Sequence, residues 1–458
     1  MDMLAGLADP RKLSNGTRHD FQEILVMTIS AVLSDCDTME DVVEWSRMHE
    51  SWLRRFMVLK NGIPSEDTFL RIFRLLDPKG FETCFRRWVS QVVTQLSGTI
   101  AVDGKTVRGS GGGGETAIHM VSAFATNLGL VLGQEKVSVK SNEITAIPEL
   151  LDALYLKGFL VSIDAMGCQR AIAEKIIARK ADYLLAVKGN QPRLHQAIQD
   201  AFLDRQDQIV HVEQAEHGHG RLVAQRCSVL PASGIVSKSD WPECAVIARI
   251  DSVRQVKGKP LGMEQRYYIA SRDLTPAEVA EAVRSHWGIE NQLHWVLDIT
   301  MKEDASTVRK DNAPENLSLL KKIVLNLLRI DTSDKVKSSL RLKRKRAAWD
   351  DELRMRFLGL LATADIQPMQ AAGQLFDPHL HLAMTTDSRA GVPDGAVVAV
   401  LREGYRQRGR VLRYAEVSVN QAADAHSAPA TDSTISDTHP APRGDHLQQD
   451  APLEGNER

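Results

Sequence analysis

A short apolar stretch that ends in a lone carboxylate constrains the fold of this chain more than any other feature. Residues Ile100 to Ser110 have the sequence I-A-V-D-G-K-T-V-R-G-S, in which Asp103 follows the apolar run and precedes a glycine. Such a run, ending in turn residues, predicts a buried strand. Taken alone, Asp103 is most simply the first residue of a β-turn. A charge in a buried run is nevertheless costly unless it is paired or binds a metal.

The apolar segments that follow predict an α/β fold. The expected elements are strands at 119–124 and 130–134, a helix at 143–156, a strand at 159–163, a helix at 171–179 and a strand at 183–188. Three strands followed by helix, strand, helix and strand is the order of the RNase H-like fold, whose metal-binding carboxylates lie on the first and fourth strands. The fourth expected strand ends in Asp164. The glycine-rich residues 110–114 predict a flexible hairpin loop or lid, and they lack the ending of a P-loop.

A third carboxylate lies in a helix that is expected to begin at Thr275, where a threonine cap precedes a proline. In this helix His286, Glu290 and His294 follow one another at four-residue steps, which places them on successive turns of one side. A polar helix side is ordinarily just solvated. Two neighbouring tryptophans and the two strand-end aspartates favour a functional site instead.

Asp103, Asp164 and Glu290 together have the chemistry of a two-metal site. Two Mg²⁺ ions about 3.5–4 Å apart can activate an attacking oxygen and stabilise a leaving oxygen at phosphorus. Mg²⁺ prefers oxygen ligands and keeps several waters, so three carboxylates and a phosphate suffice. The long interval between Asp164 and Glu290 is explained by a β-rich insertion at 195–272, with strand candidates at 223–230, 244–253 and 265–271.

Composition limits the class of protein. A chain of 458 residues predicts two or three domains. The net charge of −2 excludes a global basic field, so any surface for nucleic acid must be local. Five scattered cysteines without a C-x-x-C pair predict reduced thiols, and no signal peptide or membrane-spanning run is present. We therefore expect a cytoplasmic protein with no membrane partner.

Several strings resemble those of DDE transposases of bacterial insertion sequences, in the branch that includes the H-repeat-associated proteins. They are V-D-G-K-T-V-R-G, K-S-N-E-I-T-A-I-P, S-I-D-A-M-G-C-Q, A-V-K-G-N-Q-P and H-W-G-I-E-N-Q-L-H-W-V-L-D, and the resemblance covers about residues 8–360. It implies an RNase H-like catalytic core with a β-rich insertion and a helical N-terminal associated domain. It also implies cut-and-paste DNA transposition, with Asp103, Asp164 and Glu290 as the catalytic, metal-binding triad for two Mg²⁺ ions or Mn²⁺. The partners would be DNA, as element ends and target, and a second copy in a homodimer.

Basic and polar residues near the three carboxylates are candidates for DNA contact. The wider family's tyrosine, arginine and lysine positions are occupied here by Val283, His286 and Leu297, so we expect His286 or Arg284 to contact phosphate instead. His219 and Arg221 belong to an H-G-H-G-R segment, for which a simple hairpin turn is equally acceptable. The full set is Lys105, Arg108, Lys188, Asn190, His219, Arg221, Arg284 and His286. The basic tract 335–346 is either a phosphate-binding patch or a solvated helix.

The chain beyond residue 361 has a different character. The series Phe376-Asp377-Pro378, Gly404-Tyr405 and Gly409–Arg413 is similar to the C-terminal β-domain signature of GrpE, the nucleotide exchange factor of the DnaK chaperone. The long dimerisation helix of GrpE is missing. The alternative functions are therefore a GrpE-like co-chaperone that binds a DnaK-type partner, or an inactive fusion product.

The expected domains are listed here in chain order. They are a helical N-terminal domain (1–98), the first part of the RNase H-like core (99–194), the β-rich insertion (195–272), the second part of the core with basic helices (273–361), a small GrpE-like β-domain (362–420) and a disordered tail (421–458).

Overall fold

The protein is described from a computed structural model. It describes residues 2–4, 6–12, 17–93, 97–138, 141–218, 221–256, 262–331, 338–361, 366–369, 371–389, 391–402, 405–407 and 410–421. The contacts divide the chain into two compact units, residues 1–368 with 405–413, and residues 369–404 with 414–458. Among the described residues, no helix is long and apolar enough to cross a membrane. The tail predicted to be disordered lies outside the described residues beyond residue 421.

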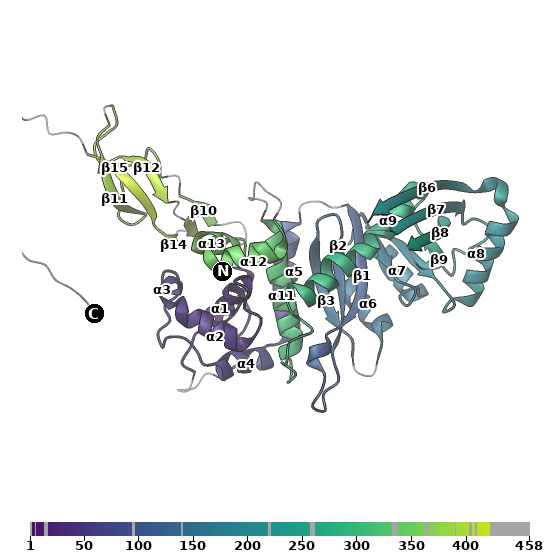
Figure 1. The fold of residues 1–458 in the computed structure, drawn as a ribbon, viewed down its shortest axis with the longest axis horizontal. Coiled ribbons are helices and arrows are strands. Elements are labelled where there is room, and N and C mark those ends of the chain that lie inside the picture. The colour runs from purple at the N-terminus through teal and green to yellow at the C-terminus, as the bar shows by residue number, and fades with distance from the viewer. Residues whose placement is uncertain are drawn as a thin grey trace, which may run out of the picture. The chain divides into compact units, whose positions relative to one another are not determined.

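The N-terminal part of the first unit is helical, as the sequence predicts (Figure 1). After the short 3-10 turn η1 (Asp2–Leu4), the helices are α1 (Phe21–Leu33), α2 (Met39–Met48), α3 (Glu50–Leu53), α4 (Glu66–Leu75) and α5 (Pro78–Val92). Thr38 begins α2 with a capping box, and Asp77 accepts hydrogen bonds from the first turn of α5. The apolar sides of these helices are buried, and α1 is buried over nearly its whole length.

The expected strands form part of one large sheet. They are β1 (Gly98–Thr106), β2 (His119–Ala125), β3 (Leu130–Lys136), β4 (Phe159–Ile163) and β5 (Asp182–Val187). Their order is β3-β2-β1-β4-β5, in which β1 pairs antiparallel with β2 and parallel with β4. The mixed α/β class and the pairing of β2 with β3 are therefore confirmed. In the parallel pair Val102 lies opposite Ile163, so Asp103 and Asp164 each directly follow the last pair.

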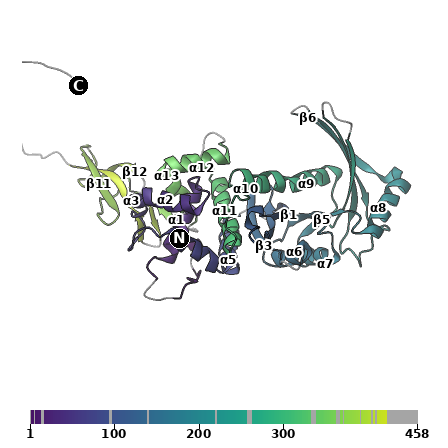
Figure 2. The ribbon, with the colours of Figure 1, turned by 60° about the horizontal axis from the view of Figure 1, so that its bottom comes forward.

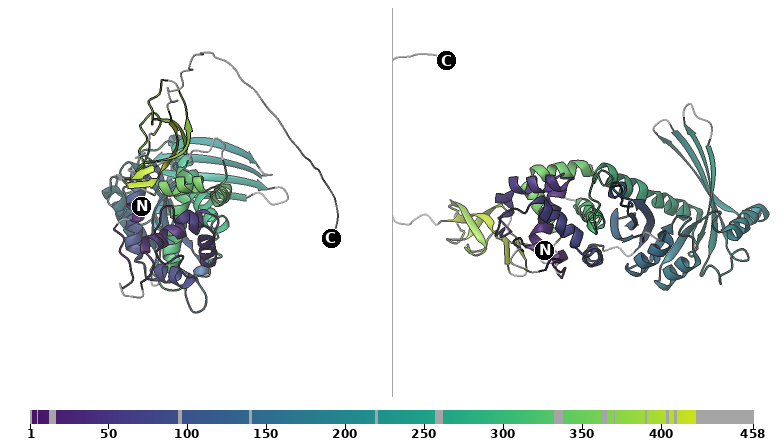
Figure 3. Two further views of the ribbon diagram at one scale, coloured as in Figure 1. Left: turned by 90° about the vertical axis from the view of Figure 1, so that its left-hand side faces the viewer. Right: turned by 90° about the horizontal axis from the view of Figure 1, so that it is seen from below.

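The segment between β5 and the third carboxylate adds four strands to the same sheet. These strands are β6 (Val210–Gly218), β7 (Arg221–Pro231), β8 (Val246–Val256) and β9 (Gly262–Ala270), and β9 pairs antiparallel with β5. Figure 3 shows that the strands at this edge extend past the helices that cover the rest of the sheet. The prediction of β structure from residue 195 is wrong at its start, because α8 (Pro192–Asp204) comes first, with a proline in its first turn and Ile198 and Phe202 buried.

Helices cover both faces of the sheet (Figure 2). On one face lie α6 (Glu143–Asp152) and α7 (Arg170–Ala178), and on the other lies α9 (Pro276–Ile289), which contacts β1, β4 and β7. The predicted Thr275 cap is present as a capping box with Glu278. The helix does not continue regularly. A π-helical turn (Glu290–His294) joins α9 to α10 (Trp295–Ile299), and the Trp295 N–H donates to the Glu290 carbonyl five residues earlier.

The remaining helices of the first unit connect the sheet to the N-terminal helices. They are α11 (Ala313–Ile330), α12 (Leu340–Trp349) and α13 (Asp351–Gly359). The long α11 is buried along most of its length and contacts α1, α4, α5 and β3 (Figure 1). The backbone N–H of Met3 donates to the Leu361 carbonyl, so the two ends of this helical part meet.

Short strands follow α13. A three-stranded sheet is made by β10 (Ile366–Pro368), β13 (Tyr405–Gln407) and β14 (Arg410–Arg413), in the order β10-β13-β14. A second is made by β11 (His381–Asp387), β12 (Val397–Arg402) and β15 (Ala415–Asn420), in the order β11-β15-β12. The sequence predicts a small β-domain at 362–420, and these short strands lie within that range.

Candidate metal and DNA site

The ends of two neighbouring strands bring the first two predicted carboxylates together. Asp103 follows Val102 in β1, and Asp164 follows Ile163 at the end of β4, where these two apolar residues are paired. Because the strands are parallel and in this register, both carboxylates lie at the same level of the sheet, Asp103 within β1 and Asp164 directly after β4. Both side chains are half-buried. The strand pattern and the register thus account for this part of the predicted site.

The loop after Asp164 is held in place by two sets of hydrogen bonds. One carboxylate oxygen of Asp164 accepts from the backbone N–H of Met166 (3.0 Å) and of Gly167 (3.2 Å). The side-chain amide of Asn190, at the end of β5, donates to the Ala165 carbonyl at 2.6 Å. Asn190 was predicted as a DNA contact, and the structure assigns its amide to this loop.

Glu290 reaches the same edge from the opposite direction. It is exposed and lies at the first position of the π-helical turn. Ligand atoms of Asp103, Glu290 and His294 all lie within 4.8 Å of one another, and Asp164 is not a member of this group. π-Turns inside α-helices occur frequently at functional sites. Here the turn contains both Glu290 and His294.

His294 is the residue of this group that the predicted triad lacks. Its side chain is 9% exposed, and its Nδ1 lies 3.6 Å from Oδ2 of Asp103. Its Nε2 is buried and has no hydrogen-bond partner. Burial lowers the pKa of His294 to about 4, with further contributions from Lys322 and Lys105. The four-residue spacing from Glu290 is the sequence signal that could have included this residue in the site.

Asp103 is electrostatically strained by its neighbours. Its pKa is raised to about 7, mainly by burial and also by the carboxylates of Glu290, Asp164 and Glu143, against a hydrogen bond from the Gly104 backbone. A carboxylate with such a pKa lacks a compensating positive charge. The site therefore has the donor chemistry and the charge deficit that a divalent cation would satisfy.

A side-chain pair lies over Gly104, next to Asp103. The His119 ring nitrogen Nε2 and Oε1 of Glu143 are 2.7 Å apart, and a Cβ at Gly104 would collide with both atoms. Gly109 has a similar role, since a Cβ there would collide with the backbone carbonyls of Asp304 and Ser306. The glycines of the motif thus allow close packing.

The glycine run that follows the motif forms a tight turn, in which Gly112 bridges to Glu115. Gly112, Gly113 and Gly114 all have positive φ, a backbone conformation that favours glycine.

Lys105 occupies a cage of carboxylates. Its ammonium nitrogen lies 2.7 Å from Asp298, 2.9 Å from Glu303 and 3.1 Å from Asp304. Burial alone would lower the pKa of Lys105, but Glu303 and Asp298 raise it above its ordinary value. Lys105 was predicted to contact DNA, and the structure instead commits its charge to these three partners. Arg108 is different, because its side chain is 83% exposed.

The other predicted DNA contacts lie at several places. Lys188 is exposed at the end of β5. Arg284 donates to the side chain of Gln214 in β6, and Nδ1 of His286 lies 3.1 Å from the Ser162 hydroxyl. Arg221 begins β7, and its side chain lies outside the described residues, as does the whole of His219. Of the described cationic candidates, Arg108, Lys188 and Arg284 are exposed, and the guanidinium of Arg284 binds Gln214.

The basic tract has a structural role where it is described. Arg344 is fully buried, and its guanidinium donates to the carbonyls of Val32, Cys36 and Thr300. The ammonium of Lys343 donates to the carbonyls of Leu328 (2.8 Å) and Asp331 (2.6 Å). These two charges are therefore not part of a free phosphate-binding patch.

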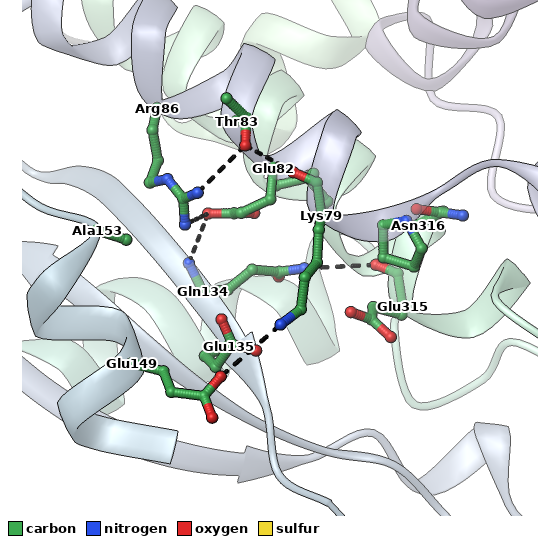
Figure 4. A pocket seen from close by; sticks show the side chains of 12 residues that line it. Lys79, Glu82, Thr83, Arg86, Gln134, Glu135, Glu149, Ala153, Glu315 and Asn316 are labelled. Carbon is green, nitrogen blue, oxygen red and sulfur yellow. Dashed lines mark hydrogen bonds and ion pairs between the residues drawn. The ribbon is translucent and has the colours of Figure 1, made fainter. Parts of the chain in front are cut away.

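A separate hollow of about 250 Å³ lies where α5 meets β3, α6 and α11 (Figure 4). Glu82 lies in its wall, with Oε1 accepting from the backbone N–H of Gln134 at 2.9 Å. Burial raises the pKa of Glu82 to about 7. None of the predicted metal or DNA residues lines this hollow.

Comparison with known proteins identifies the class of protein that this fold and site define. The family model of the transposase DDE domain matches residues 94–327, and that of the DDE_Tnp_1-associated domain matches residues 1–89. The chain therefore belongs to the DDE-domain transposase family.

Two individual relatives agree with this family assignment. The chain is 40% identical over 358 residues to YncI of Escherichia coli O157:H7, a proposed transposase, covering 76% of this chain and 91% of the relative. It is 39% identical over 345 residues to YhhI of Escherichia coli K12, a proposed H repeat-associated transposase, covering 72% and 90%. A piggyBac transposase synaptic complex with hairpin DNA matches with a TM-score of 0.38 and 10% identity, over 78% of this chain and 76% of that one, too weakly to bear on the fold.

The C-terminal segment is similar to a different family. The GrpE family model matches residues 326–421, which confirms the predicted resemblance. Protein GrpE of Synechococcus elongatus is 43% identical over 67 residues, which cover 15% of this chain and 32% of that protein. The chain thus spans about a third of the length of this GrpE relative.

Proposed function

We propose that this protein is the DNA transposase of an insertion sequence, and that Asp103, Asp164 and Glu290 form its metal-binding catalytic site. The observation that carries this proposal is the pairing of Val102 with Ile163, which puts Asp103 and Asp164 at one sheet edge, with Glu290 within ligand distance of Asp103. Family membership supports the activity. The strand order β3-β2-β1-β4-β5, with helices on both faces, supports an RNase H-like core.

The residues fit a divalent cation. Asp103 lies near Glu290 and is influenced by the charge of Asp164 without a compensating positive charge, and its raised pKa reflects that deficit. We propose Mg²⁺ as the ion, two per site, with Mn²⁺ able to replace it. When bound, such ions activate the attacking oxygen and stabilise the leaving oxygen during phosphoryl transfer. The chain itself fixes the ligands, through the β1–β4 register, the hydrogen bonds to Asp164 and the π-turn at Glu290.

DNA would approach the exposed edge of this site. Arg108 and Lys188 are exposed basic residues at the ends of β1 and β5, and we assign them to phosphate contact. Arg221 and His219 remain proposals of the same kind. We propose that the protein acts as a homodimer in the cytoplasm. We also propose the domain boundaries at residues 98, 194, 272 and 361 given above, except that the β-rich part begins after α8.

A cleavage assay tests the proposed function. The substrate is DNA that carries the gene and its flanking inverted repeats, with Mg²⁺ present. Asp103→Ala and Glu290→Ala should each reduce end cleavage at least about 10²-fold, because each removes a metal ligand. Glu281→Gln, an exposed change two turns before Glu290 on the same helix, is the control and should cleave like the parent. Parental cleavage by either alanine variant would refute the assignment.

A second candidate function rests on the GrpE match. Residues 326–421 would promote nucleotide exchange on a DnaK-type chaperone. The measurement is release of ADP from DnaK with the full chain added. Faster release would support this function, and unchanged release would leave the segment as part of an inactive fusion.

A further inference from the structure

His294 is a buried imidazole whose nitrogens lack the partners that burial requires. The residue is 7% exposed, and its Nε2 has no hydrogen-bond partner. Its Nδ1 is 3.6 Å from Oδ2 of Asp103, which is too long for a hydrogen bond. Buried polar atoms are nearly always satisfied, and Nδ1 lies beside the Asp103 carboxylate without a hydrogen bond, so this side of the ring requires an explanation.

The His294 ring lies close to the carboxylates of Asp103 and Glu290. One ligand atom from each of His294, Asp103 and Glu290 lies within 4.8 Å of the other two. Donors bound to one ion at about 2.1 Å each lie at most about 4.2 Å apart. Only one pair of three donors can lie that far apart, and adjacent donors in an octahedron lie about 3 Å apart, so the three groups need to close by up to about 2 Å to share an ion.

We propose that His294 is a ligand of the divalent ion held by Asp103 and Glu290, so that this site carries one nitrogen donor besides its carboxylates. This inference rests on the proposed function, because it needs the same carboxylates to bind metal. The π-turn is the device that presents both residues, since it begins at Glu290 and ends at His294.

A nitrogen ligand changes which ion the site prefers. Mg²⁺ strongly favours oxygen ligands, whereas later divalent metals accept imidazole more readily. A site with His294 should therefore bind Mn²⁺ more tightly than Mg²⁺ by a larger factor than a site built from carboxylates alone. The alternative role for His294 is to position Asp103 without touching metal, and that role predicts no nitrogen coordination.

The test uses the full chain with Mn²⁺ as the only added metal. Pulsed electron paramagnetic resonance should detect ¹⁴N coupling to bound Mn²⁺, and labelling histidine with ¹⁵N should replace that signal with a ¹⁵N signal. His294→Gln should abolish the nitrogen coupling and weaken Mn²⁺ binding at least about tenfold, with a smaller effect on Mg²⁺. His286→Gln and His119→Gln are the matched controls and should keep the coupling. If His294→Gln does not fold, these controls and the labelled parent still assign the nitrogen.

The outcomes separate the two proposals. Asp103-dependent Mn²⁺ binding without nitrogen coupling in the parent would overturn the role of His294 and leave the carboxylate site intact. Loss of coupling in His286→Gln or His119→Gln would assign the nitrogen to another histidine and also overturn it. Equal Mn²⁺ binding by the parent and Asp103→Asn would instead overturn the metal site of the proposed function.

Discussion

Two carboxylate clusters lie next to one another in this protein, and they differ in where their positive charge comes from. Asp298, Glu303 and Asp304 surround the ammonium of Lys105, all within 3.1 Å. The cluster of Asp103, Asp164 and Glu290 has no such cation among the described residues. Only two positions of β1 separate Asp103 from Lys105.

The pKa values show the consequence of that difference. Burial would raise the pKa of Glu303, but Lys322 and Lys105 lower it below its ordinary value. Burial raises the pKa of Asp103 to about 7, and its carboxylate neighbours add to the rise. A cluster that contains its own cation stabilises the fold, whereas a cluster without one stores repulsion that a bound metal relieves.

The largest effect is expected from removing the internal cation. Lys105→Met leaves three carboxylates around an apolar side chain and should destabilise the protein by about 3–5 kcal/mol. The measurement is the urea midpoint of the full chain. The control is Lys310→Met, which replaces an exposed lysine close in sequence to Asp304 and should change the urea midpoint little. An unchanged urea midpoint for Lys105→Met would mean that the ion pairs around Lys105 do not stabilise the fold.

Neutralising Asp103 in the cluster without a cation should stabilise the metal-free protein rather than destabilise it. The folded pKa of Asp103 lies above its unfolded value of 3.8, so the metal-free fold loses stability as pH rises from about 4 to about 7. Asp103→Asn removes this loss and should stabilise the metal-free protein by about 2–4 kcal/mol at pH 8, and by almost nothing near pH 4. Melting curves of both proteins in EDTA across this range test it, with Asp273→Asn as an exposed control. A pH-independent difference would contradict the assignment.

Metal should stabilise only the cluster that lacks a cation. At 100 times its Kd, Mg²⁺ or Mn²⁺ should stabilise the parent by about 2.7 kcal/mol, and EDTA should reverse the effect. Asp103→Asn should show a much smaller rise in Tm. Asp304→Asn changes the other cluster and should keep the metal-dependent rise. Equal metal-dependent rises in Tm for Asp103→Asn and Asp304→Asn would contradict this prediction.

The smallest effect is expected at the anchor of the Asp164 loop. Asn190→Ala removes the hydrogen bond to the Ala165 carbonyl and should cost about 1 kcal/mol of stability. If Asn190 only positions the loop, cleavage should fall while binding of end DNA is unchanged. A loss of DNA affinity with parental stability would restore its predicted role as a DNA contact.

The sequence predicts those elements that depend on the local pattern of apolar and capping residues. Apolar runs located β1, β4 and β5, and the Thr275 signal located the start of α9, because these depend on neighbouring residues. The juxtaposition of Asp103 and Asp164 follows from the parallel pairing of β1 and β4, in which each aspartate directly follows the last pair, Val102 with Ile163.

The sequence could not assign partners that are distant along the chain. Lys105 looked like a phosphate contact because its cage comes from residues nearly 200 positions away. The π-turn was also missed, since it alters one turn of an otherwise regular helical pattern. The helix α8 was assigned to the β-rich part because it is short and weakly apolar, with three buried residues.

Arg344 has a consequence for the order in which the chain folds during synthesis. Its guanidinium donates to the carbonyls of Val32 in the last turn of α1 and of Cys36 after it, 312 and 308 positions away, and to the Thr300 carbonyl at the end of α10. The ribosome must therefore release most of the transposase part before these helix ends are satisfied. Until then the carbonyls of Val32 and Cys36 lack the donor that they have in the folded protein, and water must take its place.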